Sequence, residues 1–276
     1  MITVASTDDV TLAVHDLGGE GRPLLWCHAT GFHGRVWRAM AAEFPDRHNL
    51  ALDFRAYGDS TPPASGRIVW DGFGDDVLAV IDTLQLDQVQ VVGHSKGGAA
   101  ALMAATRNPE RFDRIACYEP IVFPGTPEER ASAGENPMAA GARRRRTSFD
   151  SMEDAIANFS AKPPLAVLRD DVLDDYVRFG FRQEADGTVT LKAEPEYEAQ
   201  TYEMGSRHAT FDHLAELGLP VLIGASGDGG MPAQMAPLVA ERLPNAELVR
   251  FDDLDHFGPL ADPPAVAAVI RGFLAR

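Results

Sequence analysis

Gly93-His94-Ser95-Lys96-Gly97 is the stretch of this sequence that decides its fold. An apolar run, Val89 to Val92, precedes it, and the helix-prone run Gly98-Ala99-Ala100-Ala101-Leu102-Met103 follows it. A serine with a glycine two residues away on each side, between a strand and a helix, is typical of a nucleophile elbow, because glycine lets the two elements pass close together. The pattern predicts a strained, exposed Ser95 whose hydroxyl can attack a carbonyl group. Alone it is a weak signal, since an ordinary glycine-rich turn gives the same five letters.

Short apolar runs alternate with helical patterns on both sides of this turn, as far as residue 124 and again after residue 213. Such alternation predicts crossover units that build a mostly parallel sheet of eight strands flanked by helices. The expected strands are residues 2–5, 11–15, 24–28, 50–54, 89–93, 114–118, 221–225 and 247–251. The expected helices are residues 36–43, 72–84, 96–107, 233–243 and 264–274. The glycine-rich loop at residues 18–21 is expected to end an opening antiparallel pair.

The alternation stops between residues 125 and 213, where the sequence is rich in charge and interrupted by prolines. This change predicts an insertion after the sixth strand, a helical cap on a core formed by residues 1–124 and 214–276. Its expected helices are residues 138–146, 152–159, 171–179 and 196–204, with a short extended piece at 188–192.

Composition limits the classes of function. The 276 residues are 45% hydrophobic, enough for a sizeable core, and the net charge of −16 repels phosphates. We therefore expect no nucleic-acid partner and no membrane partner. The beginning of the chain shows no basic segment followed by an apolar run, and no stretch of about 18 apolar residues occurs. A cytoplasmic protein that binds a small-molecule substrate, as a monomer or homodimer, is the expectation.

The cysteines and histidines divide into structural and chemical groups. Cys27 and Cys117 lie in strand-like apolar runs and are expected to be buried, inert thiols. His28 and His94 are expected to bond nearby backbone. Nucleophilic serine chemistry requires a base, and His256 lies in the loop after the last expected strand, where a base can reach the elbow.

The order Ser95, Asp228, His256 resembles that of the α/β-hydrolase family. Two further segments carry the resemblance. His28-Ala29-Thr30-Gly31 is similar to the family's His-Gly-x oxyanion segment, with Ala29 in place of the usual glycine. Asp53-Phe54-Arg55-Ala56-Tyr57-Gly58-Asp59-Ser60 is similar to the family's D-x-R-G-x-G-x-S loop. The resemblance covers essentially the whole chain and implies a cap-bearing serine hydrolase.

The resemblance also implies roles for single residues. Ser95 is the nucleophile, His256 the base and Asp228 the acid that orients it, with Glu119 as the alternative acid. The backbone N–H groups of Lys96 and Thr30 form the oxyanion hole, with Ala29 as the alternative to Thr30. No metal and no organic cofactor is implied.

Two basic features have alternative interpretations. The Lys96 side chain either pairs with Glu119 beneath the site, which we favour, or attracts a carboxylate of the substrate. The run Arg143-Arg144-Arg145-Arg146 is either an anion-binding rim or a solvated helix face paired with acids, and the second is favoured because four consecutive helical residues point in different directions.

Aromatic residues gather in the segments expected to cover the site, which suggests an apolar pocket for the acyl or alcohol part of a substrate. They are Phe32, Trp37, Phe123, Phe149, Phe159, Tyr176 and Phe257.

These observations predict a hydrolase that cleaves carboxylic esters or related acyl bonds through an acyl-enzyme. The same scaffold also hosts carbon–carbon bond hydrolases, thioesterases and cofactor-free perhydrolases, and fold alone does not select among them. A non-catalytic ligand-binding receptor with a vestigial triad is the alternative from another class.

Overall fold

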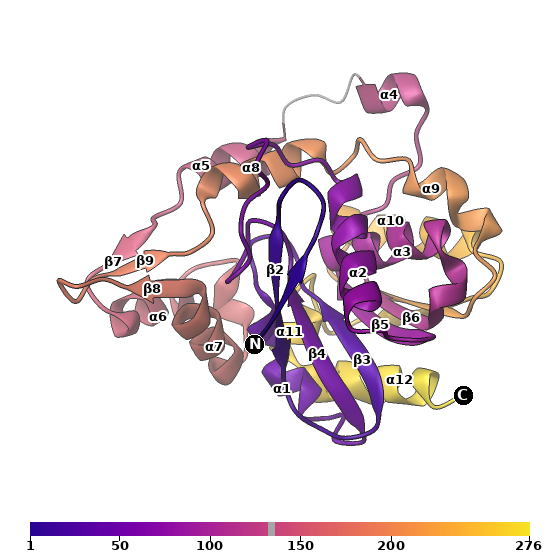
Figure 1. The fold of residues 1–276 in the computed structure, drawn as a ribbon, viewed down its shortest axis with the longest axis horizontal. Helices are drawn as coiled ribbons and strands as arrows, with labels where there is room; N and C mark the ends of the chain where they lie inside the picture. The colour runs from indigo at the N-terminus through magenta and orange to yellow at the C-terminus, as the bar shows by residue number, and fades with distance from the viewer. Residues whose placement is uncertain (132–135) are drawn as a thin grey trace.

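An eight-stranded sheet forms the centre of the computed structural model, which describes residues 1–131 and 136–276 (Figure 1). The strand order is β1-β2-β4-β3-β5-β6-β10-β11. β2 runs antiparallel to both of its neighbours, and all other neighbours in the sheet are parallel. The strands are β1 (Ile2–Ala5), β2 (Thr11–Asp16), β3 (Arg22–Cys27), β4 (Arg47–Asp53), β5 (Val89–His94), β6 (Phe112–Tyr118), β10 (Val221–Ser226) and β11 (Ala246–Phe251). The predicted sheet is confirmed.

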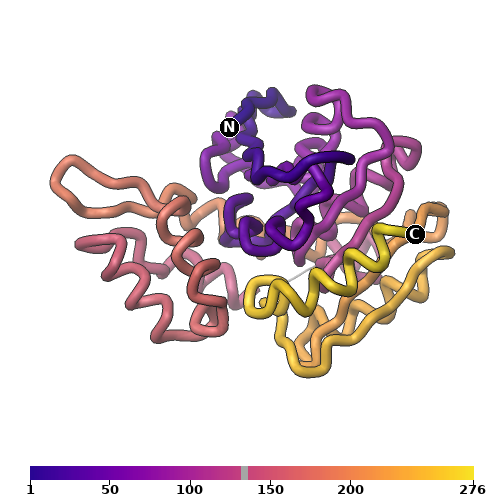
Figure 2. The backbone as a smooth tube through the Cα atoms, turned by 90° about the horizontal axis from the view of Figure 1, so that it is seen from below, coloured from indigo at the N-terminus to yellow at the C-terminus, as the bar shows by residue number. Residues whose placement is uncertain are grey.

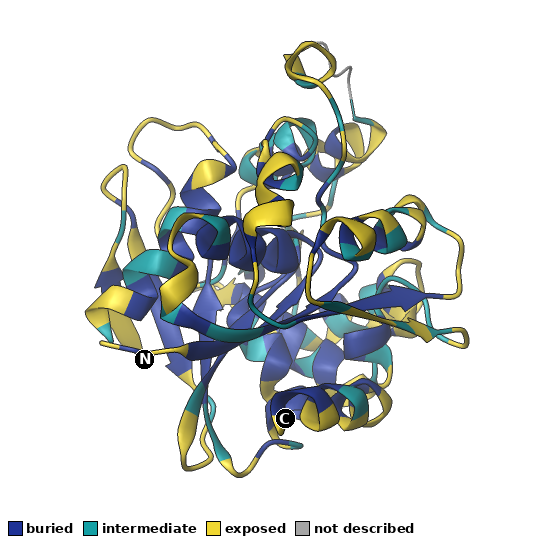
Figure 3. Cartoon of the chain, turned by 90° about the vertical axis from the view of Figure 1, so that its right-hand side faces the viewer, coloured by how far each residue is buried: buried dark blue, intermediate teal, exposed yellow. Residues whose placement is uncertain are grey.

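Both faces of the sheet are covered, so its central strands are buried on both sides. Successive side chains of β3 alternate between two apolar clusters: Leu25 and Cys27 belong to one, Leu24 and Trp26 to the other. The first cluster includes side chains of α2 (Asp71–Thr83), α3 (Lys96–Arg107) and α10 (Met231–Arg242). The second includes side chains of α1 (Arg38–Ala41) and α12 (Pro263–Leu274). Figure 3 shows the resulting blue sheet between helices whose outer faces are exposed.

The chain between β6 and β10 adds no strand to the large sheet. The middle part of this segment extends to one side of the sheet (Figures 1 and 2), while its first and last helices lie toward the opposite side (Figure 1). Its helices are α4 (Pro127–Ala131), α5 (Pro137–Arg143), α6 (Met152–Ser160), α7 (Asp170–Gly180), α8 (Pro195–Met204) and α9 (Thr210–His213). Residues 132–135 of the predicted insertion lie outside the described residues.

The inserted segment also holds a small antiparallel sheet in the order β7-β9-β8, of which the expected helical cap with one extended piece anticipates only a part. Its strands are β7 (Ser148–Phe149), β8 (Phe181–Gln183) and β9 (Val189–Leu191), of which only β9 coincides with a predicted extended piece. Strands of two or three residues are too short to show an alternating pattern. The other short elements among the described residues are α11 (Gly258–Ala261) and the 3₁₀ turns η1 (Gly34–Trp37), η2 (Pro109–Arg111), η3 (Leu165–Val167) and η4 (Leu214–Glu216).

Hydrogen bonds tie α7 and α8 to the core. The Tyr57 hydroxyl donates to Thr201 Oγ1 at 2.9 Å, and Trp70 Nε1 donates to the Thr201 carbonyl at 2.9 Å. His33 Nε2 lies 3.1 Å from the carbonyl oxygen of Tyr176. All of these donors come from segments that follow β3 and β4, so the inserted helices are held at the carboxyl end of the sheet, where open α/β folds bind ligands.

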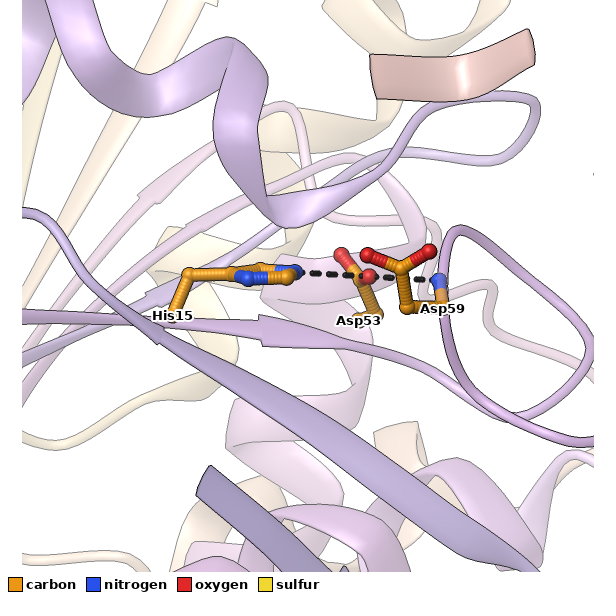
Figure 4. A group of neighbouring side chains, drawn as sticks. All are labelled: His15, Asp53 and Asp59. Carbon is orange, nitrogen blue, oxygen red and sulfur yellow. Dashed lines mark hydrogen bonds and ion pairs between the residues drawn. The ribbon is translucent and has the colours of Figure 1, made fainter. Parts of the chain in front are cut away.

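The Asp53 carboxylate anchors the loop that leaves β4 (Figure 4). Its Oδ2 lies 2.8 Å from His15 Nε2 and accepts the Asp59 backbone N–H at 2.8 Å, while Oδ1 accepts the Gly34 N–H at 2.6 Å. His15, Asp53 and Asp59 carry ligand types that also bind metals. His15 Nε2 and both oxygens of Asp53 already have partners, and Asp59 Oδ1 binds Lys192 Nζ at 2.6 Å. The cluster therefore serves to hold the loop.

A second buried carboxylate, that of Asp76, holds Arg55 of the same loop. Asp76 of α2 is fully buried and receives the Arg55 guanidinium through Nε at 3.0 Å and Nη2 at 2.6 Å. It also accepts the Arg55 backbone N–H at 3.1 Å and the Ser6 hydroxyl at 2.7 Å.

We predict that Asp76→Ala lowers the free energy of unfolding by about 3–5 kcal/mol, because it leaves the buried Arg55 charge without its carboxylate partner. The matched control is Asp82→Ala on the same helix, since Asp82 pairs with Arg111 at the surface and an exposed pair contributes about 0–1 kcal/mol. Urea unfolding followed by circular dichroism measures both. Equal losses for the two variants would contradict this account.

Candidate active site

Ser95 occupies a strained turn between β5 and α3, with φ of 55° and ψ of −116°. The flanking glycines are required by contact. A Cβ atom at Gly93 would lie 2.6 Å from Gly98 Cα, and one at Gly97 would lie 2.1 Å from the Cys27 carbonyl oxygen. No side chain fits at either position, so the turn has the geometry of the predicted nucleophile elbow. The prediction of an exposed Ser95 is wrong, because the residue is buried, at 6% exposed.

His256 lies in the loop between β11 and α11, and its imidazole contacts a buried glutamate. Its Nδ1 lies 2.5 Å from Oε2 of Glu119, the residue that follows β6. Glu119 is fully buried in a left-handed conformation with φ of 46°, and its Oε1 accepts the Ser226 backbone N–H at 2.7 Å. A carboxylate in this position keeps the proton on Nδ1, which leaves Nε2 free to act as a base.

The prediction that Asp228 orients the imidazole is wrong in this structure. Asp228 Oδ1 accepts the Ser226 hydroxyl at 2.9 Å and the Gly230 N–H at 2.7 Å, and Oδ2 accepts the backbone N–H of His256 at 3.3 Å. Partial burial raises the pKa of Asp228, but these hydrogen bonds outweigh it and hold the pKa below its ordinary value. Asp228 shapes the backbone of two loops, and the alternative acid Glu119 holds the ring.

His94 connects the nucleophile to the histidine loop. Its Nε2 donates to the His256 carbonyl at 2.7 Å, and the two imidazole centroids lie 4.8 Å apart. Burial lowers the pKa of His94 well below its ordinary value, so the ring stays neutral. His256 is thus held beside the residue that precedes Ser95.

Within the described part of the chain, no hydrogen bond joins the Ser95 hydroxyl to the His256 ring. In sites without a bound substrate, the hydrogen bond between a nucleophile and its base is often long or poorly aligned.

The segment after β3 lies against the start of α3, as Gly97's close approach to Cys27 shows. His28 fixes this segment: its Nδ1 donates to the Ala29 carbonyl at 2.7 Å, and its Nε2 accepts the Phe54 N–H at 3.1 Å. Both His28 and His94 therefore bond backbone, as predicted. Across the described residues, the backbone N–H groups of Thr30 and Lys96 donate no hydrogen bond, so both are free to bind an oxyanion.

Lys96 has a different environment from either prediction. Glu119 binds His256 instead, and the terminal nitrogen of Lys96 is enclosed by three aromatic rings. Its Nζ lies 4.2 Å from the ring centroid of Phe54, 3.9 Å from that of Tyr57 and 4.6 Å from that of Phe73. Nζ has no hydrogen-bond partner among the described residues. Complete burial lowers the pKa of Lys96 well below its ordinary value.

A cavity of about 510 Å³ lies between the core and the inserted segment. Thr30 and Gly31 of the oxyanion segment line it, together with aromatic residues from both sides. The aromatic residues are Phe32, Phe159, Tyr176, Tyr202 and Phe257. Because Thr30 belongs to the segment after β3 and Phe257 follows His256, the cavity adjoins the oxyanion segment and the histidine loop.

Three of the aromatic residues predicted to line the pocket do not. Trp37 is buried in the core against Trp26, with ring centroids 5.2 Å apart. Phe149 packs behind the cavity wall on Phe159, at 5.5 Å between centroids. Phe123 is absent from the residues described as lining the cavity. Phe32 and Phe257 do line it, with centroids 5.9 Å apart.

The arginine run divides between solvent and cavity. Arg143 is exposed and binds Glu196 and Glu203, as expected of a solvated face. Arg145 lines the cavity, where it binds Glu198 and donates to the Tyr176 hydroxyl at 2.6 Å. Glu198 could not be recognised from the sequence, because it lies in the first turn of α8 close to exposed acids.

This combination of an elbow serine, a histidine held by a buried carboxylate and free backbone donors defines a hydrolase-type site on a doubly covered sheet. The family model of the alpha/beta hydrolase fold matches residues 22–263, and the chain belongs to this family. Among the described residues, no helix has the length and apolarity needed to cross a membrane.

Comparisons with individual proteins agree with the family. The chain is 27% identical to 2-hydroxymuconate semialdehyde hydrolase of Pseudomonas putida, over 95% of this chain and 90% of that protein. The crystal structure of E-2-(acetamidomethylene)succinate hydrolase superposes with a TM-score of 0.80 at 20% identity, over 100% of this chain and 99% of that one. A thermophilic esterase from Thermogutta terrifontis has a TM-score of 0.74 at 22% identity, over 99% and 97%. The two structures share the fold with this chain.

We predict that Lys96→Met raises the free energy of unfolding by about 1–3 kcal/mol at neutral pH, because methionine fills similar space without a buried unsatisfied amine. The gain should shrink as the pH rises toward the ordinary lysine pKa. Below that pKa the unfolded chain binds a proton that folding removes from Lys96, so wild-type stability increases with pH.

Urea unfolding of both proteins at several pH values measures this difference. A destabilised Lys96→Met variant would show instead that the three rings hold Lys96 as a stabilising cation.

Proposed function

We propose that this chain is a serine hydrolase that cleaves carboxylic esters or related acyl bonds of a small substrate through an acyl-enzyme. The observation that carries the proposal is the 2.5 Å contact between Glu119 and His256 beside a strained elbow serine. Membership in the alpha/beta hydrolase fold family supports hydrolysis as the class of reaction.

In the first half of the reaction, Ser95 Oγ attacks the carbonyl carbon while His256 Nε2 accepts its proton. The imidazolium that forms is stabilised by the Glu119 carboxylate, whose full burial strengthens the interaction. The oxyanion binds the N–H groups of Lys96 and Thr30. Collapse of this intermediate breaks the acyl–oxygen bond, and His256 returns the proton to the leaving alcohol.

In the second half, a water molecule attacks the acyl-enzyme. His256 accepts one proton of the water, and the new oxyanion uses the same two backbone donors. Collapse of the second intermediate releases the carboxylic acid and restores the Ser95 hydroxyl with the proton from His256. None of these steps calls on a metal or an organic cofactor.

We further propose that residues 125–213 act as a cap that selects the substrate. The cavity supports this proposal, because α5, α6, α7 and α8 contribute side chains to one wall while Thr30, Gly31, Phe32 and Phe257 of the core form the other. Mostly apolar walls with a few polar groups are typical of small-molecule sites.

Hydrolysis of a carbon–carbon bond is the second candidate. The relative from Pseudomonas putida, aligned over 95% of this chain, is named as a hydrolase of 2-hydroxymuconate semialdehyde. Such a reaction would use the same Ser95, His256 and Glu119.

We predict that a fluorophosphonate probe labels wild-type protein on one residue and that Ser95→Ala abolishes the labelling. Intact-protein and peptide mass spectrometry measure the modification and its position. Ser6→Ala is the matched control, because Ser6 is a serine of the core whose hydroxyl is engaged by the Asp76 carboxylate. It should label like the wild type.

A panel of p-nitrophenyl esters with acyl chains of two to twelve carbons then separates the reactions. Turnover of any ester supports the acyl-bond hydrolase. Labelling without ester turnover would reject the esterase and leave the carbon–carbon bond hydrolase. Absence of labelling in a folded protein would reject both and favour the ligand-binding receptor.

A further inference from the structure

We propose that Glu198 of the inserted segment recognises a hydrogen-bond donor on the substrate, in the first place a hydroxyl group near the reacting carbonyl. This inference rests on the proposed function, because it takes the cavity beside Ser95 as the substrate site. It adds a residue that selects the substrate, and it assigns a chemical class to the group selected.

Glu198 is a cavity residue with its two carboxylate oxygens in different surroundings. It is 7% exposed, lies in the first turn of α8 and lines the cavity with Thr30 and Gly31. Its Oε2 is engaged by the Arg145 guanidinium. Its Oε1 is directed toward the oxyanion segment and would lie 3.1 Å from a Cβ atom at Gly31.

Oε1 is an unused acceptor. Among the described residues, no hydrogen bond engages Oε1. This oxygen is not fully buried either, since it is absent from the completely buried polar atoms that lack a partner. A carboxylate oxygen that is neither bonded nor sealed in a cavity binds either water or a donor of the ligand. Because a carboxylate accepts and does not donate, the matching ligand group is a donor.

The surrounding contacts fix this oxygen in place. Arg145 holds Oε2 and also donates to the Tyr176 hydroxyl at 2.6 Å, and Tyr176 packs on Phe32 with centroids 5.3 Å apart. The Gly31 backbone, with φ of 83°, lets the carboxylate approach the chain directly after Thr30. An acceptor held this close to an oxyanion donor can reach a hydroxyl on the acyl chain of a bound ester.

The charge balance argues against the opposite assignment, an anion site at Arg145. The Arg145 charge is already paired with Glu198, and its remaining contact is with a neutral phenol. A carboxylate of the substrate placed here would face the free oxygen of Glu198, which repels it.

The test compares phenyl propanoate with phenyl 2-hydroxypropanoate and phenyl 3-hydroxypropanoate, with phenol release giving kcat/KM. We expect Glu198→Gln to lower kcat/KM about 10- to 100-fold for at least one hydroxy ester, the range for a lost hydrogen bond to a charged group. Phenyl propanoate should change less than about threefold. Intrinsic ester reactivity cancels, because each ester is compared between variants.

Glu196→Gln is the matched control. Glu196 lies on the same helix two residues away and also pairs with an arginine of the same run, Arg143, but this pair is exposed. Its substitution should leave all three esters unchanged. Equal losses for all three esters in Glu198→Gln would overturn the proposal, since they would indicate that Glu198 only supports the oxyanion segment.

A binding measurement keeps the inference separate from catalysis. Calorimetric titration of the same esters into Ser95→Ala, and into Ser95→Ala with Glu198→Gln, reports recognition without turnover. We expect the second substitution to weaken a hydroxy ester about 10-fold or more and to leave phenyl propanoate unchanged. Equal affinities for hydroxy and plain esters in Ser95→Ala would overturn the inference even if Ser95 is catalytic. If Ser95→Ala still binds a hydroxy ester more tightly than phenyl propanoate but the wild type hydrolyses no ester, the inference about Glu198 stands and only the esterase reaction is rejected.

Discussion

The hydrogen bond between the buried Glu119 carboxylate and the imidazole of His256 is the interaction on which the site depends. It joins the end of β6 to the loop after β11, two segments 137 residues apart in the sequence. Glu119 also accepts the Ser226 N–H at the end of β10, so one carboxylate fixes three chain segments at the carboxyl edge of the sheet. Full burial makes this arrangement costly to break and therefore rigid.

The inserted segment completes the site from the other side. Its helices α7 and α8 are held to the core by hydrogen bonds of Tyr57, Trp70 and His33. The inserted segment and the core each form one wall of the cavity. In the proposed function the core supplies the reactive groups, and the inserted wall supplies the Glu198 Oε1 oxygen, which has no hydrogen-bond partner among the described residues. Chemistry and selectivity are thus assigned to different parts of the chain.

Much of the fold could be predicted from the sequence, because strands covered on both faces leave long apolar runs and the elbow leaves its glycines. The sequence could not show whether Asp228 or Glu119 binds the His256 imidazole. Both residues follow strands at the same edge of the sheet, and only the contacts made by the loops distinguish them. The Asp228 carboxylate accepts hydrogen bonds from the backbone N–H groups of Gly230 and His256. Glu198 could not be predicted for another reason. Its neighbours Glu194 and Glu196 are exposed, and only the packing of the folded chain buries Glu198.

The most direct test of the central claim is the rate at which a fluorophosphonate modifies Ser95 in Glu119→Gln and in Asp228→Asn. A glutamine at position 119 presents an amide to His256 Nδ1 and cannot stabilise the imidazolium, so the rate should fall about 10³- to 10⁴-fold. Asp228→Asn should cost less than about tenfold, because Asp228 contacts only the backbone of His256. The reverse order, with Asp228→Asn the more damaging change, would contradict the account.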